Sequence, residues 1–177
     1  MTHDPFTVLG LEPRFDVDLA AAEVRHRELS RALHPDRYQG KPAAERRMAL
    51  ERAIEVNAAW RALRDPVTRA EALLAAGGVE LDERAEPKAS PALLMEMMEL
   101  QEELAEVRGK RDAAGLRRLG EALRTREREL CARLAPAFAA ARGDAARLRA
   151  LLPAVGELRY LRRFFEAYAA AEEELAA

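Results

Sequence analysis

The chain has 177 residues, of which 49% are hydrophobic, 34% are charged and only 5% are aromatic. This blend, rich in alanine, leucine, glutamate and arginine, favours helices over a sheet-rich core. The 29 Lys and Arg residues are balanced by 31 Asp and Glu residues, and the formal net charge of −2 argues against a general nucleic-acid binder. The single cysteine, Cys131, excludes an internal disulfide framework and a Cys-rich metal site.

The first half of the chain predicts two long antiparallel helices with short flanking helices. Apolar residues recur at helical spacing over residues 18–33 and 42–64, and Pro35 ends the first helix because proline restricts the residue before it. The short loop HPDRYQGKP joins the two helices, so their apolar faces can pack against each other. A shorter helix, VTRAEALLAA, ends at a pair of glycines. These elements predict a first module over residues 1–76.

The second half predicts an antiparallel three-helix bundle over residues 91–177, and the fold class is therefore all-α. Residues 77–90 are polar, contain glycine and proline and show no helical period, so they are predicted to form a linker. The helical pattern then resumes in three blocks, 91–109, 112–142 and 144–175. Asp112 and Asp144 can cap the second and third blocks. Pro153 lies inside the third block, where it predicts a kink or a break.

Neither a signal peptide nor a membrane span is expected. The N-terminal segment MTHDPFTVLG lacks a basic flank followed by a long apolar core. No apolar run approaches the roughly 20 residues that a spanning helix needs. We therefore expect a soluble, cytoplasmic protein that binds neither nucleic acid nor membrane.

The tripeptide His34-Pro35-Asp36, in the loop between the two long helices, is the first candidate functional site. Proline stiffens the corner, and the two polar side chains project in a fixed relation, so little entropy is lost when a partner docks. A purely structural turn would explain Pro35 and Asp36 but not His34 at the helix exit. A catalytic pair would need a nucleophile, and none is in an obvious place. The three histidines also lack paired metal-ligand spacing. We predict a docking site without enzymatic activity, metal or cofactor.

Basic side chains beside this corner predict an electrostatic docking surface. Arg27 and Arg31 lie roughly opposite the apolar face of the first long helix, and Arg37 follows the corner. Most such runs are simply solvated faces. Beside the corner, we interpret this one as a surface for an acidic patch on a partner, which would speed association more than it would tighten the complex.

The segment LLMEMMELQEELAEV, residues 93–107, carries two different faces. The face predicted to pack in the core keeps a spacing of four and three residues and comprises Leu93, Met97, Leu100, Leu104 and Val107. The opposite arc holds three large apolar residues and three carboxylates: Leu94, Met95, Met98, Glu99, Glu102 and Glu106. Methionine adapts its shape to a partner and glutamates select one with basic residues, so this arc is predicted to bind a protein.

The third block is predicted to extend the same surface. One face can carry Leu158, Leu161, Phe165 and Tyr168 into the core. Tyr160 and Phe164, four residues apart, point elsewhere and could form an exposed aromatic pair that completes this surface. The alternative for Phe164 is a place in the core, if Pro153 rotates the helix.

Several motifs in order carry a resemblance to a known family. PFTVLGL, then HPDR between two helices, then NAAWRALRDP resemble a J-domain. LRDPVTRAEALL and LLMEMMELQEEL resemble the HscB-like co-chaperones of iron–sulfur cluster assembly, and the resemblance covers nearly the whole chain. It implies that His34, Pro35 and Asp36 dock on an ATPase chaperone of the DnaK/HscA type and accelerate its ATP hydrolysis. His26 stands where the family usually has a large aromatic residue, and we expect it to fill space in the core.

The same resemblance implies that the second half binds an IscU-like scaffold protein, on which the cluster is assembled. The positions matching that surface are Leu94, Met95, Met98, Glu99, Glu102, Glu106 and Tyr160. We expect a monomeric co-chaperone that delivers the scaffold to the chaperone and assists the maturation of iron–sulfur proteins. Three alternatives stay open: a J-domain adaptor for a different client, a small hydrolase using His34 and Asp36, and a plain helical oligomerisation module.

Overall fold

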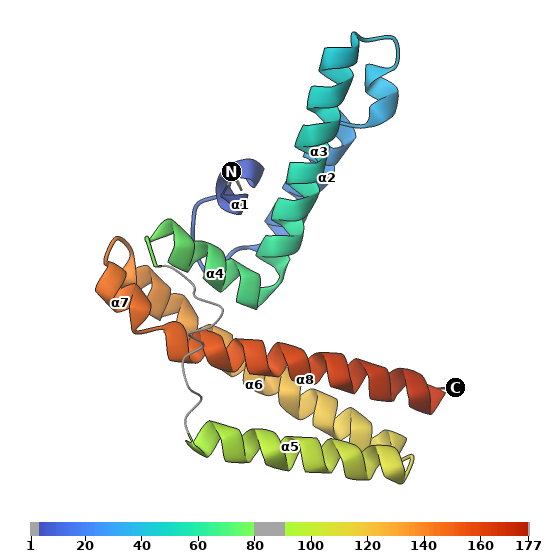
Figure 1. Ribbon diagram of the computed structural model, residues 1–177, viewed down its shortest axis with the longest axis vertical. Helices are drawn as coiled ribbons and strands as arrows, with labels where there is room; N and C mark the ends of the chain where they lie inside the picture. Colours follow the sequence, from blue (N-terminus) through green and yellow to red (C-terminus); the bar gives the residue numbers. More distant parts are fainter. Residues whose placement is uncertain (1–3, 80–90, 177) are drawn as a thin grey trace. The chain divides into compact units, whose positions relative to one another are not determined.

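The computed structural model describes residues 4–79 and 91–176. They belong to two compact units, Met1–Val79 and Glu80–Ala177. Every regular element of the described residues is helical (Figure 1), which confirms the predicted all-α class. Residues 80–90, the larger part of the predicted linker, lie outside the described residues.

The N-terminal unit is built around two long antiparallel helices that lie side by side (Figure 1). Asp18 caps the first of them: its carboxylate accepts a hydrogen bond from the backbone N–H of Ala21 at 3.0 Å. Pro66 occupies the first position of the short last helix, where its missing N–H leaves no bond unmade. The elements of this unit are α1 (Pro5–Leu9), α2 (Leu19–Ala32), the 3-10 helix η1 (Pro35–Tyr38), α3 (Ala43–Arg64) and α4 (Pro66–Ala76).

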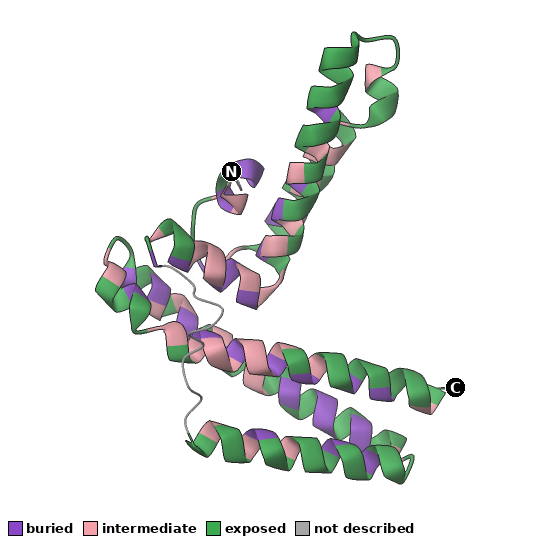
Figure 2. Cartoon of the chain, viewed as in Figure 1, coloured by how far each residue is buried: buried purple, intermediate pink, exposed green. Residues whose placement is uncertain are grey.

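The core of this unit lies where α1 packs on α3. Its fully buried cluster comprises Phe6, Val8, Leu9, Val56, Ala59 and Leu63. The α2 helix joins it through half-buried side chains, and the His26 ring stacks on Trp60 with centroids 5.6 Å apart. His26 therefore fills space in the helix interface, as predicted. From His34 to Met48 no residue is buried, so the end of the helix pair that carries the connecting loop stands outside this core (Figure 2).

The C-terminal unit is a bundle of three long helices (Figure 1). Its elements are α5 (Pro91–Gly109), α6 (Ala113–Ala141), α7 (Ala145–Arg149) and α8 (Leu152–Ala176). Asp112 and Asp144 cap α6 and α7, as predicted. The predicted third block is divided before Pro153, which lies in the first turn of α8, where its missing N–H disrupts nothing.

The buried stripe of α8 differs from the predicted one. Phe164 is only 5% exposed and belongs to the core, whereas Phe165 is half-buried. Steps of three and of four residues both return close to the same helical face, so the pattern after Leu161 did not distinguish the two phenylalanines. The predicted exposed pair was therefore wrong for Phe164, and Tyr160 is half-buried rather than exposed.

Gly120 permits a close approach of α6 and α8. A Cβ added at this position would lie 2.6 Å from Cζ and Oη of Tyr168, which is buried. We expect Gly120→Ala to destabilise the C-terminal unit by about 1–3 kcal/mol, because overpacking outweighs the helix propensity of about 1 kcal/mol that alanine adds. Thermal unfolding followed by circular dichroism measures this. Gly156→Ala is the control, since nothing lies within 4 Å of its added Cβ; equal midpoints for both variants would contradict the account.

The cap of α6 makes a small acid-sensitive contribution. The Asp112 carboxylate accepts hydrogen bonds from the backbone N–H groups of Gly115 and Ala114, at 2.9 and 3.0 Å, which hold the pKa of this carboxyl below its ordinary value of 3.8. A depressed pKa in the folded state stabilises the fold above the unfolded pKa, and this stabilisation is lost as the pH falls through the folded pKa. Asparagine also caps but does not titrate. Between about pH 5 and pH 2, Asp112→Asn should therefore lose less thermal stability than the wild type; parallel losses would refute this.

Candidate functional site

The His34-Pro35-Asp36 corner is exposed and locally rigid. His34 has an extended backbone (φ −61°, ψ 135°) and caps η1, whose first residue is Pro35. Proline fixes its own φ and excludes the helical conformation for the residue before it, so the chain must turn here. The His34 side chain is 58% exposed and that of Asp36 is 74% exposed. Both side chains are therefore accessible to another molecule.

The imidazole is held by its own turn. Nδ1 of His34 lies 3.4 Å from the backbone nitrogen of Asp36 and 3.4 Å from its carboxylate oxygen Oδ2. An unprotonated Nδ1 accepts from the N–H, whereas contact with the carboxylate requires a proton on Nδ1, so the two contacts belong to different states of the ring. Both are long and weak. A solvated, weakly coupled pair suits recognition better than proton transfer.

The predicted basic residues flank this corner on both sides. Arg31 lies in the last turn of α2 and Arg37 in η1, and both are exposed. Arg27, one turn further back, pairs with Glu23 and is thereby partly neutralised. Among the described residues no ion pair involves Arg31 or Arg37. The positive charge is consequently strongest next to the corner.

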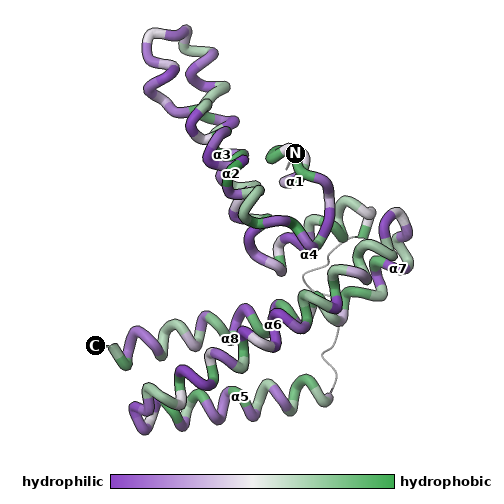
Figure 3. Tube along the Cα trace, turned by 180° about the vertical axis from the view of Figure 1, so that it is seen from behind, coloured by the Kyte–Doolittle hydropathy of each residue, from purple (hydrophilic) through white to green (hydrophobic). Residues whose placement is uncertain are grey.

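The two faces of α5 are those expected from the sequence. Met97, Leu104 and Val107 are buried, and Leu93 and Leu100 are half-buried. On the other face Leu94, Met95 and Met98 are 45%, 64% and 61% exposed. Figure 3 shows hydrophobic and hydrophilic stretches alternating along this helix. Its outer face therefore presents large apolar side chains that the bundle does not use.

Carboxylates accompany this apolar face. Glu99, Glu102 and Glu106 are all exposed. The ammonium group of Lys110 hydrogen-bonds to Glu106 and holds the pKa of that carboxyl below its usual range. Lys110 lies beyond the segment 93–107 and was not predicted to contact this face, although its i,i+4 spacing from Glu106 was a visible signal. Lys110 thus offsets part of the charge of Glu106.

Tyr160 meets α5 at a groove. The groove, of about 500 Å³, lies between α5 and α8, and its lining includes Leu94, Met98, Tyr160, Arg163 and Phe164. The Arg163 guanidinium lies 4.6 Å from the centroid of the Tyr160 ring. The structure therefore brings Tyr160 together with two predicted residues of α5, and Phe164 contributes from the buried side. Arg163 was not predicted; its spacing of three residues from an aromatic was the available signal.

Metal-ligand clusters and membrane-spanning helices are both absent from the described residues. In residues 4–79 and 91–176 no group of three or more His, Cys, Asp or Glu side chains could hold a metal ion. Over the same ranges, no helix has the combination of length and apolar character that crossing a membrane requires.

A helix pair whose connecting loop carries His-Pro-Asp, together with a helical bundle, is consistent with the fold of a J-domain co-chaperone. Comparison with known proteins is more specific. Residues 89–168 match the family model described as the HSCB C-terminal oligomerisation domain. The chain is similar to chaperone HscB from Vibrio cholerae, with 28% identity, a TM-score of 0.79 and coverage of 97% of this chain and 98% of that one. These matches support the resemblance to the HscB-like co-chaperones that the sequence motifs indicated.

The human co-chaperone HscB shares the fold. It superposes with a TM-score of 0.82 at 24% identity, over 97% of this chain and 83% of the human one. The helical arrangement is thus retained although about three residues in four differ.

Proposed function

We propose that this chain stimulates the ATPase of a DnaK/HscA-type chaperone and delivers an IscU-like scaffold protein to it. The observation that carries the proposal is the presence of two exposed, chemically different surfaces on two compact units. One is a stiff polar corner with flanking arginines, and the other is an apolar face with carboxylates. A chain that must bind two partners at once needs two such surfaces.

The first surface is proposed to bind the chaperone. Its residues are His34, Pro35, Asp36, Arg27, Arg31 and Arg37. The arginines would steer the encounter with an acidic patch, and the corner, already ordered by η1, would dock with little loss of entropy. Binding that favours the hydrolysis-competent state of the chaperone accelerates its ATPase without bond chemistry by this chain.

The second surface is proposed to bind the scaffold. Its residues are Leu94, Met95, Met98, Glu99, Glu102, Glu106 and Tyr160. The apolar side chains offer adaptable contact area and the glutamates favour a partner with basic residues. Holding the scaffold on the same chain as the chaperone-binding corner raises its effective concentration near the chaperone.

Two observations and one electrostatic argument weigh against the alternatives. The family match falls on the C-terminal unit, the part in which an adaptor for a different client would differ. A hydrolase is disfavoured because His34 and Asp36 are both mostly exposed. Self-association is named in the description of the matching family. A two-fold dimer through the outer face of α5 would, however, bring its glutamates close to those of the second copy, which is unfavourable.

The direct test combines the purified chain with a chaperone of this type and an iron–sulfur scaffold. Steady-state ATP hydrolysis is measured with the chain alone, the scaffold alone and both together. We expect stimulation by the chain and a larger, more than additive rate with both. Mass measurement by light scattering in parallel reports on self-association. An unchanged ATPase rate would overturn the proposal, and a stable homodimer that excludes the scaffold would favour the oligomerisation alternative.

A further inference from the structure

The helix that carries the proposed scaffold-binding face has the smallest share of buried residues among the three long bundle helices. Three of its 19 residues are buried, compared with nine of 29 in α6 and six of 25 in α8. A small apolar contact fixes the rotation and position of a helix only weakly. Polar contacts between α5 and its neighbours therefore contribute more to the orientation of its outer face than they would in a well-buried helix.

Arg126 of α6 connects all three long helices. It forms an ion pair with Glu96 of α5, and its NH2 group donates to Oε1 of Glu157 on α8 at 3.1 Å. The side chains of Arg126 and Glu157 are only 23% and 19% exposed, and that of Glu96 is 45% exposed. Attraction between charges is stronger at such partly buried sites than at the surface. Removing the arginine would leave two carboxylates near each other, with Arg133 at 3.7 Å from Glu157 as the remaining cation.

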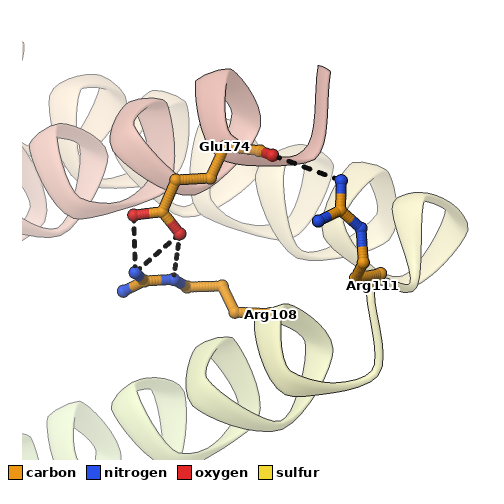
Figure 4. A network of polar contacts seen from close by, with 3 residues as sticks. All are labelled: Arg108, Arg111 and Glu174. Atoms are coloured by element: carbon orange, nitrogen blue, oxygen red, sulfur yellow. Dashed lines mark hydrogen bonds and ion pairs between the residues drawn. The ribbon is translucent and has the colours of Figure 1, made fainter. Parts of the chain in front are cut away.

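A second contact holds the other end of α5. The Arg108 guanidinium donates to both carboxylate oxygens of Glu174, with NH2 at 2.8 Å from each (Figure 4). Arg111, in the loop that follows α5, reaches the backbone oxygen of the same glutamate at 3.5 Å. The side chains of Arg108 and Glu174 are 42% and 56% exposed, and ion pairs at such exposure contribute little. Both partners of the Arg126–Glu96 pair are less exposed than Glu174, and Arg126 is also less exposed than Arg108, so we expect the pair of Arg126 to be the stronger attachment of α5.

We propose that Arg126 is a positioning residue for scaffold binding. Glu96 lies in the same turn of α5 as Leu94, Met95 and Met98, so the ion pair with Arg126 sets the direction in which these three side chains point. The attachment keeps them outward and keeps Leu94 and Met98 beside Tyr160 at the groove. The inference rests on the proposed function for its consequence, whereas the attachment itself is measurable without a partner.

The experiment uses the full chain with Arg126→Gln, Glu96→Gln and the double variant. Hydrogen exchange of the α5 amides reports on the attachment, and calorimetric titration with an IscU-like scaffold reports on binding. We expect Arg126→Gln to accelerate exchange in α5 while the α6 core stays protected, and to weaken scaffold affinity about fivefold, since the competent orientation becomes less populated. The double variant should be no weaker than Arg126→Gln, because both changes remove one interaction. Arg126→Lys should recover part of the affinity.

Arg124→Gln is the matched control, because Arg124 is an exposed arginine of the same helix. It should leave exchange and affinity unchanged. Unchanged α5 exchange in both Arg126→Gln and Glu96→Gln would overturn the inference, as would faster exchange with unaltered affinity or fully additive effects in the double variant. Arg126→Gln could also unfold the bundle. In that case the result for Glu96→Gln decides whether the inference holds, because this variant leaves the Arg126–Glu157 contact in place. A wild-type chain that binds no scaffold would instead overturn the proposed function, and exchange would still decide whether Arg126 holds α5.

Discussion

Replacing His34 by glutamine is expected to reduce the stimulation of the chaperone ATPase by about tenfold or more. Glutamine has a similar size and can form hydrogen bonds, but it lacks the flat imidazole that η1 presents to solvent. The side chain is 58% exposed and lies outside the apolar core, so the fold should be unaffected. The measurement is steady-state ATP hydrolysis by the chaperone over a range of co-chaperone concentrations.

Two controls separate docking from folding in this variant. Lys41→Gln changes an exposed cation of the same loop that is outside the proposed set, and it should retain most of the stimulation. Scaffold affinity and the unfolding midpoint of His34→Gln should equal those of the wild type. Full stimulation by His34→Gln would remove the corner from the docking surface, whereas equal losses in both variants would point to general charge effects.

Reversing two charges on α5, Glu99→Lys with Glu102→Lys, is expected to weaken scaffold binding about 100-fold. Both carboxylates are exposed on the outer face, and lysines there would repel the basic residues of the partner proposed for this face. Chaperone stimulation in the absence of scaffold should persist, because His34 lies in the other unit. Calorimetric titration measures the affinity.

The control for this pair makes the same change in net charge elsewhere in the bundle. Glu121 and Glu129 are exposed residues of α6 outside the proposed surface, and reversing both should alter affinity only slightly. If the α6 pair weakened binding as much as the α5 pair, long-range steering would explain the effect and the α5 face would lose its proposed role.

The fold could be predicted because its signals are local. Asp18 and Asp112 mark helix starts by capping, and apolar residues at steps of three and four mark the buried faces. Phe164 was misassigned because it and Phe165 both lie near the buried stripe, and only the packing of α8 against its neighbours selects one. At Pro153 the sequence predicts a kink or a break without distinguishing the two, because the choice also depends on how the helix packs.

In the candidate site, too, local signals could be predicted and contacts between helices could not. The outward direction of Leu94 and Met95 follows from the period of a single helix, so a helical wheel sufficed. Arg126 was missed because its partner Glu157 is 31 positions away, and Arg108 was missed because Glu174 is 66 positions away. Contacts between helices depend on how the helices are aligned against each other, and the residue spacing within one helix does not determine this alignment.

The absence of any buried residue from His34 to Met48 has an evolutionary consequence. Substitutions in this tip remove no packed side chain, so they carry little penalty in stability. With the chaperone bound at this tip as proposed, descendants of such a chain can change their chaperone partner by substitutions in the tip, while the hydrophobic cluster stays constant. Partner choice and folding are in this way open to selection as separate traits.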